Sequence, residues 1–387
     1  MAEVRITGST QPVWSQWHAS APYTVGLEEE VMLLDPADWS LANRVDDVLP
    51  VLSSRLAERV TAETHGAAIE LATSAHPNVA AAVREAHELR AALKAELAGV
   101  GLVPASAGTH PEAVWTDVRV SGGARYQLVY GSMRELARRE PTFALHVHIG
   151  VVSSDAAITL YNRLRAHLPL LLALSVNSPF WQGRDTGLAS IRTPLFQAFP
   201  RTGIPRRFAD YEDYAETVDV MLRCGAFPEP TFLWWDVRPQ PRLGTVEVRI
   251  FDAQTSVEDS ATLAALVQAI ARLELEEGFH AEKLLTCVEV LAENRFLAAR
   301  DGMKARLIDP IGERRVSARE LLDAVLRAAR PHAVDLGCDG LLARAASLAS
   351  ETGAERQRRI AGAEPRLTKV LEHLAGAFVA PGGVIAD

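Results

Sequence analysis

The sequence predicts an α+β protein built around a single, mainly antiparallel sheet. Short segments of alternating polar and apolar residues indicate half-buried strands. They are spread over more than half of the chain, with helical periods between them. At 387 residues and 48% hydrophobic content, the chain is long enough to bury a sizeable core. We therefore expect one domain over residues 1–387, in which 285–387 form a helical C-terminal portion packed on the rest.

Four segments carry the alternation that is typical of strands, and six carry helical periods. The predicted strands are 23–35, 67–73, 143–151 and 244–252. The predicted helices are 79–100, 156–175, 259–284, 317–330, 340–352 and 364–378. Pro169 is expected to kink or divide the second helix, Asp259 or Ser260 to cap the third, and Ser317 with Glu320 to form a capping box on the fourth. Two stretches rich in Pro and Gly, 177–207 and 225–244, are long connections of the kind that often carry function.

Composition excludes several classes of protein. The net charge of −9 and the absence of a basic patch argue against nucleic-acid binding. The longest apolar run, LPLLLALSV, is too short to span a membrane. Three widely spaced cysteines, Cys224, Cys287 and Cys338, and the lack of a signal-peptide pattern predict a cytoplasmic protein without a disulfide framework.

Three adjacent glutamates stand in the apolar segment YTVGLEEEVMLLD. Alternate side chains of a strand share a face. Glu28 and Glu30 therefore point the same way, about 6.6 Å apart along the strand. Glu29 falls on the apolar face with Leu27 and Val31, where it needs a salt bridge or an edge position because an unpaired buried carboxylate is costly.

The other three predicted strands show the same division into an apolar face and a polar face. In isolation each is also compatible with an ordinary solvent-exposed face. If all four segments share one sheet, its polar side, which we call the front face, carries acids, imidazoles and a guanidinium. The expected members are Glu28, Glu30, Glu70, His146, His148, Glu247 and Arg249.

Carboxylates that converge on one surface repel one another unless protons or cations lie between them. A cluster rich in oxygen ligands suits Mg²⁺ or Mn²⁺ better than Zn²⁺, and such ions keep coordination positions open for phosphate oxygens. Arg249 is then placed to meet the charge on a transferring phosphoryl group. The chain has no GxxxxGK[ST] and no GxGxxG after a strand, so those loops do not hold the phosphates.

The connection NSPFWQGRDTGLASIRT offers groups for a substrate carboxylate. Arginines bind carboxylates with two parallel hydrogen bonds, and we favour Arg192 over Arg184, with Asn177 as a further candidate; a purely structural loop is the alternative. For several residues in other segments we expect mainly structural roles. Trp234 and Trp235 are expected to pack. Arg295 and Arg300 are expected to be structural, with substrate or phosphate contact as the alternative, and Asp236 and Arg238 either line the site or pair with each other.

Five segments together resemble the carboxylate–amine ligases of the glutamate–cysteine ligase type, and more narrowly the bacterial type-two group. They are YTVGLEEEVMLLDP, TFALHVHIGV, LALSVNSPFWQGRDTGLASIRTPLFQAFPRTGIP, LWWDVRPQPRLGTVEVRIFDAQT and ENRFLAARDGM. The resemblance implies a catalytic domain like that of glutamine synthetase, with a curved antiparallel sheet and helices on its outer face. It also implies ATP, Mg²⁺, and amide formation through an acyl phosphate. L-Glutamate and L-cysteine are the implied acid and amine.

The resemblance also implies roles for individual residues. Metal ligands are implied at Glu28, Glu30, Glu70, His148 and Glu247, with Glu63 as an additional candidate. Arg249 matches the arginine that meets the phosphates, so Arg249 and Glu247 are the expected catalytic pair, and Arg249, Glu28 and Glu30 are expected at the nucleotide. Such sheets often associate, which makes a homo-oligomer a further expectation.

Three other functions stay open at this point. One is a phosphotransferase acting on a nitrogen, as guanidino kinases of the same broad fold do. Another is a metal-dependent hydrolase using His146 and His148. The third is a binding protein that keeps the fold without catalysis, against which the complete set of acids argues.

Overall fold

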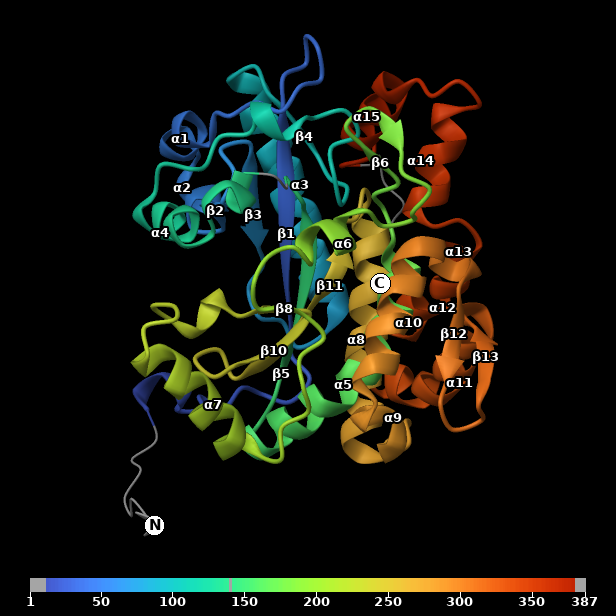
Figure 1. The fold of residues 1–387 in the computed structure, drawn as a ribbon. Helices are drawn as coiled ribbons and strands as arrows, with labels where there is room; N and C mark the ends of the chain where they lie inside the picture. The colour runs from blue at the N-terminus through green and yellow to red at the C-terminus, as the bar shows by residue number, and fades with distance from the viewer. Residues whose placement is uncertain (1–11, 139–140, 380–387) are drawn as a thin grey trace.

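The computed structural model describes residues 12–138 and 141–379, and within them a seven-stranded antiparallel sheet forms the centre of the fold (Figure 1). The strand order is β10-β11-β5-β1-β3-β2, and β4 pairs with the end of β1. The strands are β1 (Val25–Leu34), β2 (Val60–Ala62), β3 (Ala68–Ala72), β4 (Val103–Ala105), β5 (Ala144–Gly150), β10 (Val237–Gln240) and β11 (Thr245–Asp252). The prediction of an α+β fold with a mainly antiparallel sheet is confirmed, and the four predicted strands are its longest.

Three long helices pack on the apolar side of this sheet: α3 (Val79–Gly99), α5 (Ser154–Ser175) and α8 (Val257–Glu276). Each begins at a residue whose side chain accepts a hydrogen bond from the first turn: Asn78, Ser153 and Ser256. Apolar side chains of β1, β5 and β11 form one cluster with those of α5 and α8. Burial of this side fixes which residues of each strand face the other way, since a slip of one residue would reverse every side chain.

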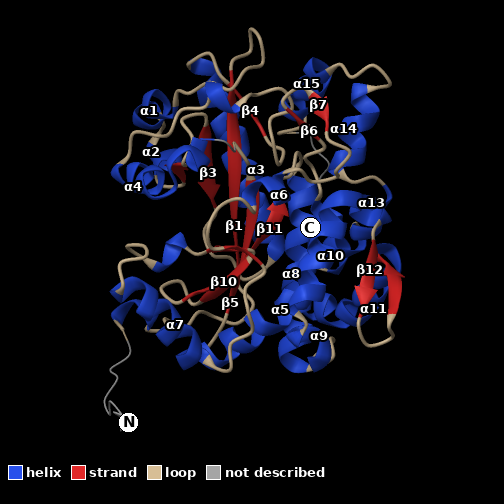
Figure 2. Cartoon of the chain, in the orientation of Figure 1, coloured by secondary structure: helices blue, strands red, loops and turns tan. Residues whose placement is uncertain are grey.

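The remaining helices lie around the sheet, and Figure 2 shows helices on both sides of it. The α-helices are α1 (Val45–Val48), α2 (Ser54–Ala57), α4 (Ala124–Met133), α6 (Arg192–Phe196), α7 (Tyr211–Arg223), α9 (Glu282–Thr286), α10 (Val288–Asp301), α11 (Ala318–Asp335), α12 (Asp339–Ala343), α13 (Ala345–Ser350), α14 (Gly353–Ala361) and α15 (Leu367–Gly376). Short 3₁₀ helices occupy Val13–Ser15, Leu49–Val51, Trp115–Asp117, Arg134–Arg138, Pro230–Phe232 and Gly302–Lys304.

Four helix predictions need correction. Ser317 caps α11 by accepting a hydrogen bond from the Arg319 amide, and not in the predicted capping box with Glu320. Helix α5 runs unbroken through Pro169. Helix α8 is capped by Ser256, not by Asp259 or Ser260, and it ends at Glu276 because the chain turns at Gly278 with φ +76°. The predicted helix 340–352 is divided into α12 and α13, and it stops before Thr352, which forms a capping box with Glu355 at the start of α14.

Several elements were not predicted because their segments lack a clear period. Two-residue strands lie within the predicted irregular connections: β6 (Phe180–Trp181), β7 (Arg184–Asp185), β8 (Thr202–Gly203) and β9 (Trp234–Trp235). Beyond residue 285, a hairpin of β12 (Arg306–Asp309) and β13 (Arg314–Ser317) accompanies the helices. Helices α11, α12 and α13 pack on α8, and α10 packs on α5 (Figure 1).

Candidate active site

The front face of the sheet brings together the polar side chains that the sequence predicted there. Glu30 of β1 lies directly opposite Glu70 of β3, and Glu28 lies opposite His146 of β5. On the next strand, Glu247 lies opposite His148. Directly opposed residues of antiparallel strands have Cβ atoms about 4.5–5.5 Å apart, so this register alone makes the side chains neighbours. The predicted common face is confirmed.

Glu29 lies on the opposite side of β1, as the alternation requires. Its two carboxylate oxygens accept hydrogen bonds from Nη2 and Nε of Arg90 on α3, both at 2.7 Å, and Oε1 accepts another from Ser260 on α8. Both charged residues are buried. The predicted need for a salt bridge is confirmed, and the pair fastens α3 to the back of the central strand.

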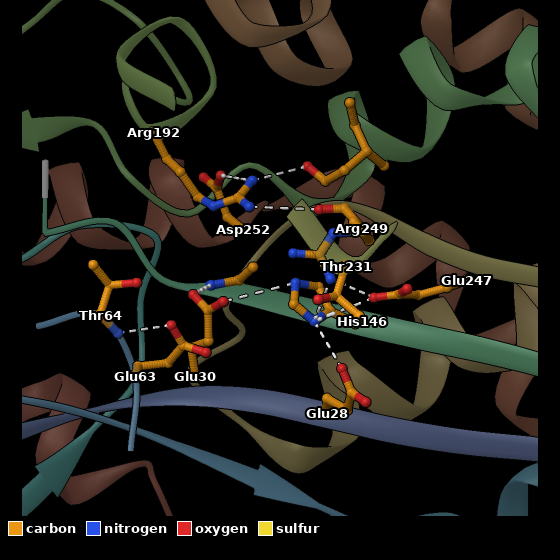
Figure 3. A network of polar contacts seen from close by, with 12 residues as sticks. Glu28, Glu30, Glu63, Thr64, His146, Arg192, Thr231, Glu247, Arg249 and Asp252 are labelled. Atoms are coloured by element: carbon orange, nitrogen blue, oxygen red, sulfur yellow. Dashed lines mark hydrogen bonds and ion pairs between the residues drawn. The ribbon is translucent and has the colours of Figure 1, made fainter. Parts of the chain in front are cut away.

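Two imidazoles and two carboxylates form the first group on the front face. His148 Nε2 lies 3.2 Å from Glu28 Oε1 and 3.9 Å from Glu247 Oε1. His148 Nδ1 contacts Thr245 Oγ1 at 2.9 Å, which orients the ring with Nε2 toward the acids. His146 Nδ1 lies 3.0 Å from Glu28 Oε2. Figure 3 shows His146 between Glu28, Glu247 and Arg249.

Glu30, Glu63 and Glu70 form a second group, whose ligand oxygens lie within 4.8 Å of one another. Burial and the neighbouring Glu63 raise the pKa of Glu30 to about 8. Burial, together with Glu28 and Glu63, raises the pKa of Glu70 well above its usual range. Backbone amides orient two of these acids: Ala144 N donates to Glu30, and Thr64 N donates to Glu63. Burial therefore favours the protonated forms of Glu30 and Glu70 when no cation lies between the carboxyls.

Glu247 is held by basic side chains. Arg238 Nε donates to Glu247 Oε2 at 2.6 Å, and Arg249 Nη1 donates to Oε1. Burial would raise the pKa of Glu247, but Arg238 and Arg249 outweigh it and hold the pKa well below its usual range. The carboxylate is therefore ionised. Arg238 thus lines the site and does not pair with Asp236, which binds Arg295 instead at 2.5 Å.

Of the candidates for a substrate carboxylate, the structure brings only Arg192 to the front face. Arg192 is the first residue of α6, and its Nη1 lies 4.0 Å from Oδ1 of the buried Asp252. Its side chain approaches the front face from the side away from Glu28 (Figure 3). Its Nη1 donates to the Ile250 carbonyl, and its buried Nε has no hydrogen-bond partner. Asn177 is buried against Ala253, Thr255 and Gln357, and Arg184 lies on the exposed hairpin of β6 and β7. Neither of these two lines the cavity.

A cavity of about 530 Å³ lies above the front face. Its floor includes Glu28, Glu30, Glu70 and Arg249, and Glu63 lies at its side. The cavity is also lined by side chains that sequence reasoning did not select: Arg125, Tyr126, Phe196, Phe199, Thr231 and Arg242. Trp234, expected only to pack, also lines it. Arg125 and Tyr126 stand on α4, a segment without a distinctive sequence pattern, so nothing in the sequence singled them out.

The residues present fit divalent metal ions. Three overlapping groups have ligand atoms within 4.8 Å: Glu28 with His148 and Glu247, Glu28 with Glu70 and His146, and Glu30 with Glu63 and Glu70. The Nε2 atom of His146 is buried and has no hydrogen-bond partner among the described residues, and Nε2 of His148 faces the carboxylate of Glu28 at 3.2 Å. Buried polar atoms are normally satisfied. Carboxylates dominate the set, which favours Mg²⁺ or Mn²⁺.

Comparison with known proteins assigns the chain to a family. Residues 24–373 match the family described as Glutamate-cysteine ligase family 2 (GCS2). The chain belongs to glutamate–cysteine ligase family 2. The predicted resemblance is thereby confirmed, and family membership makes the chain an enzyme of the ligases that form C–N bonds.

Relatives in glutamate–cysteine ligase family 2 match over nearly their whole length. A Rubrobacter xylanophilus protein named "Putative glutamate--cysteine ligase 2-3" is 40% identical over 367 residues, which cover 94% of this chain and 99% of the relative. A Gloeobacter violaceus protein named "Putative glutamate--cysteine ligase 2" is 35% identical over 364 residues, which cover 92% of this chain and 97% of the relative.

Solved structures of low sequence identity share the fold of this family member. The glutamate–cysteine ligase of Francisella tularensis, solved in complex with AMP, superposes with a TM-score of 0.65 at 14% identity, covering 94% of this chain and 90% of that one. A bifunctional glutathione synthetase from Pasteurella multocida gives a TM-score of 0.69 at 13% identity, covering 92% of this chain and 52% of that one.

None of the helices among the described residues is both long and apolar enough to cross a membrane.

Proposed function

We propose that this member of glutamate–cysteine ligase family 2 is an ATP-dependent carboxylate–amine ligase that joins L-glutamate to L-cysteine, or to another amine, through an acyl phosphate. The observation that carries the proposal is the convergence of five glutamates, two histidines and Arg249 on and beside the front face, under one cavity. The names of the relatives support the choice of substrates. The AMP bound to the Francisella tularensis enzyme supports an adenine nucleotide as co-substrate.

Six residues on and beside the front face would hold Mg²⁺ or Mn²⁺. They are Glu28, Glu30, Glu63, Glu70, His148 and Glu247. When bound, the metal ions neutralise phosphate charge and polarise the transferring phosphoryl group. His148 is fixed for this role by Thr245, and the backbone amides of Thr64 and Ala144 hold Glu63 and Glu30 in place.

The arginines supply the positive charge that the acidic floor lacks. Arg249 lies beside Glu247, with its buried Nε free of hydrogen bonds, and it offers this donor to the charge that develops on the γ-phosphoryl group. Arg192 offers its unpaired Nε from the opposite side, where it would orient the substrate carboxylate. Arg238 holds Glu247 in its ionised form.

Two displacements then complete the reaction. An oxygen of the substrate carboxylate attacks the γ-phosphorus of ATP, and ADP leaves. The amine nitrogen attacks the acyl carbon of the resulting mixed anhydride, phosphate leaves, and the amine loses a proton as the amide forms. The connection that carries Arg192, Phe196 and Phe199 lines the cavity and would help to keep water from the anhydride.

The test is an ADP-release assay with mass spectrometry of the products over pairs of carboxylates and amines. ADP release that requires both an acid and an amine, with an amide as product, is the expected result. A phosphorylated acceptor without an amide would favour the phosphotransferase. Turnover without ATP would favour the hydrolase, and no turnover with any pair would favour a binding protein. A cytoplasmic location and a homo-oligomer stay predictions, to be checked by fractionation and by light scattering.

A further inference from the structure

A second cluster of metal-binding side chains lies away from the front face. His167 on α5, Glu274 near the end of α8 and His280 in the turn after α8 have ligand atoms within 4.8 Å of one another. His167 and Glu274 are fully shielded from solvent, and His280 is half-buried. His167 Nε2 lies 2.5 Å from Glu274 Oε1, and the rings of His167 and His280 are 4.4 Å apart.

The turn after α8 is shaped to bring His280 to this place. Leu273 O accepts hydrogen bonds from the amides of both Glu277 and Gly278, at 3.0 Å. Gly278 has φ +76°, a backbone conformation that favours glycine over residues with a side chain. The glycine thus lets the chain turn sharply after α8.

Glu274 is oriented by groups that bind one of its two oxygens. Oε2 accepts hydrogen bonds from the Phe279 amide at 3.0 Å and from Arg163 Nη1 at 3.3 Å. Oε1 is thereby turned toward His167. Support of this kind, in which neighbouring donors fix a carboxylate, is what metal ligands usually receive.

Two nitrogens of the cluster have no hydrogen-bond partner in the part of the chain that the structure describes. They are Nδ1 of His167 and Nε2 of His280, and both atoms are buried. Buried polar atoms are rarely left without a partner, because their lost hydration is then not compensated. An imidazole nitrogen without a hydrogen-bond partner is a common ligand of metal ions.

We propose that His167, Glu274 and His280 bind a zinc ion. Two imidazoles and one carboxylate are a ligand set that Zn²⁺ commonly takes, with a fourth position left for water or another ligand. His280 also lines a separate cavity of about 250 Å³ with Leu284, Leu291 and Asn294, which provides the space for that fourth ligand. The ion would tie the end of α8 and the turn after it to α5. This site shares no residue with the front face and does not depend on the proposed ligase activity.

Zinc binding to the metal-free full-length protein tests the proposal. Calorimetric titration with ZnCl₂ is carried out in excess Mg²⁺, which competes for the acidic front face. The wild-type chain is expected to bind one more equivalent of zinc than His280→Gln, and zinc is expected to raise the melting temperature of the wild type but not of that variant. His87→Gln is the matched control, since His87 belongs to none of the metal-binding clusters among the described residues; it should behave as the wild type does.

Equal zinc binding by the wild type and His280→Gln, or no zinc uptake by the wild type in Mg²⁺, would overturn the site. If the variant does not fold, Co²⁺ added to the wild type decides the question. Intense visible bands from a tetrahedral site support the proposal, and the weak bands of octahedral cobalt alone refute it. ADP release is measured in parallel, so a failure of the ligase proposal is recognised independently of the zinc result.

Discussion

Glu29 and Arg90 form a buried ion pair with two parallel hydrogen bonds, directly behind the two front-face acids that flank Glu29 in the sequence. Arg90 also donates to the carbonyls of Gln254, Thr255 and Phe378. One side chain therefore connects β1, α3, the start of α8 and the C-terminal end of the described chain. The middle glutamate of the run serves the fold, and its two neighbours face the cavity.

Replacing Arg90 by methionine should lower the free energy of unfolding by about 3–5 kcal/mol, because Glu29 is left as an unpaired buried charge. Urea unfolding measures this loss. Arg55→Met is the matched control: Arg55 pairs with Glu88 at the surface, where both side chains are more than half exposed, and the expected loss is about 0–1 kcal/mol. Similar losses in the two variants would contradict the structural role assigned to Arg90.

Glu28→Gln should lower ATP-dependent ADP release by about 100-fold or more, because Glu28 belongs to two of the three groups that would hold metal. The far-ultraviolet circular dichroism spectrum should stay that of the wild type. Glu88→Gln, on the exposed side of α3, should release ADP normally. Unchanged activity of Glu28→Gln would remove the basis for the metal assignment.

Arg192→Lys should raise the KM for the substrate carboxylate about 10- to 100-fold, since a lysine cannot donate the two parallel hydrogen bonds and a charged hydrogen bond contributes about 1.5–3 kcal/mol. The KM for ATP should change little. Arg184→Lys, on the exposed hairpin, is the control. An equal rise in KM in both variants, or none in Arg192→Lys, would point to another group as the carboxylate ligand.

Metal binding should strengthen with pH. The pKa of Glu30 is about 8 in the folded metal-free protein and near 4.5 when the chain is unfolded. Between these values the folded state holds the extra proton, so the contribution of this carboxyl to stability is present below pH 4.5 and is lost as the pH rises through 8. Mg²⁺ must displace the proton, and the melting-temperature rise caused by Mg²⁺ should therefore grow from about pH 6 to about pH 8.

Glu30→Gln provides the comparison for this titration. The variant has no proton to release at this position, so the melting temperature of its metal-free form should depend less on pH over the same range. Differential scanning fluorimetry with and without Mg²⁺ measures both quantities. Identical pH profiles for the wild type and Glu30→Gln would mean that another group governs the response.

Alternation in four short segments was sufficient to predict the floor of the site. In each segment the apolar side chains had to face the core, and this fixed the direction of Glu28, Glu70, His148 and Glu247 before any strand pairing was known. The wall of the cavity could not be predicted in this way. Tyr126 and Phe196 lie on short helices outside the sheet, and their positions depend on packing between segments far apart in the chain.

The roles of the arginines were also beyond local sequence patterns. Arg238 and Asp236 are two residues apart, so pairing between them was a reasonable expectation, but Arg238 is the cross-strand neighbour of Glu247 and Asp236 meets Arg295 of α10. Arg184 and Arg192 belong to the same connection, but the chain folds back over the sheet only at Arg192. Both outcomes depend on contacts between residues far apart in the sequence.

The order of strands in the central sheet also bears on synthesis of the protein. Strand β5 lies between β1 and β11, and Glu247 is separated from Glu28 by more than half of the chain. A nascent polypeptide that has emerged from the ribosome only as far as β5 has neither Glu247 nor Arg249. Ribosome-bound chains that end before Thr245 should therefore be unable to retain nucleotide, and that capacity should arise only when β11 has emerged and joined the edge of β5.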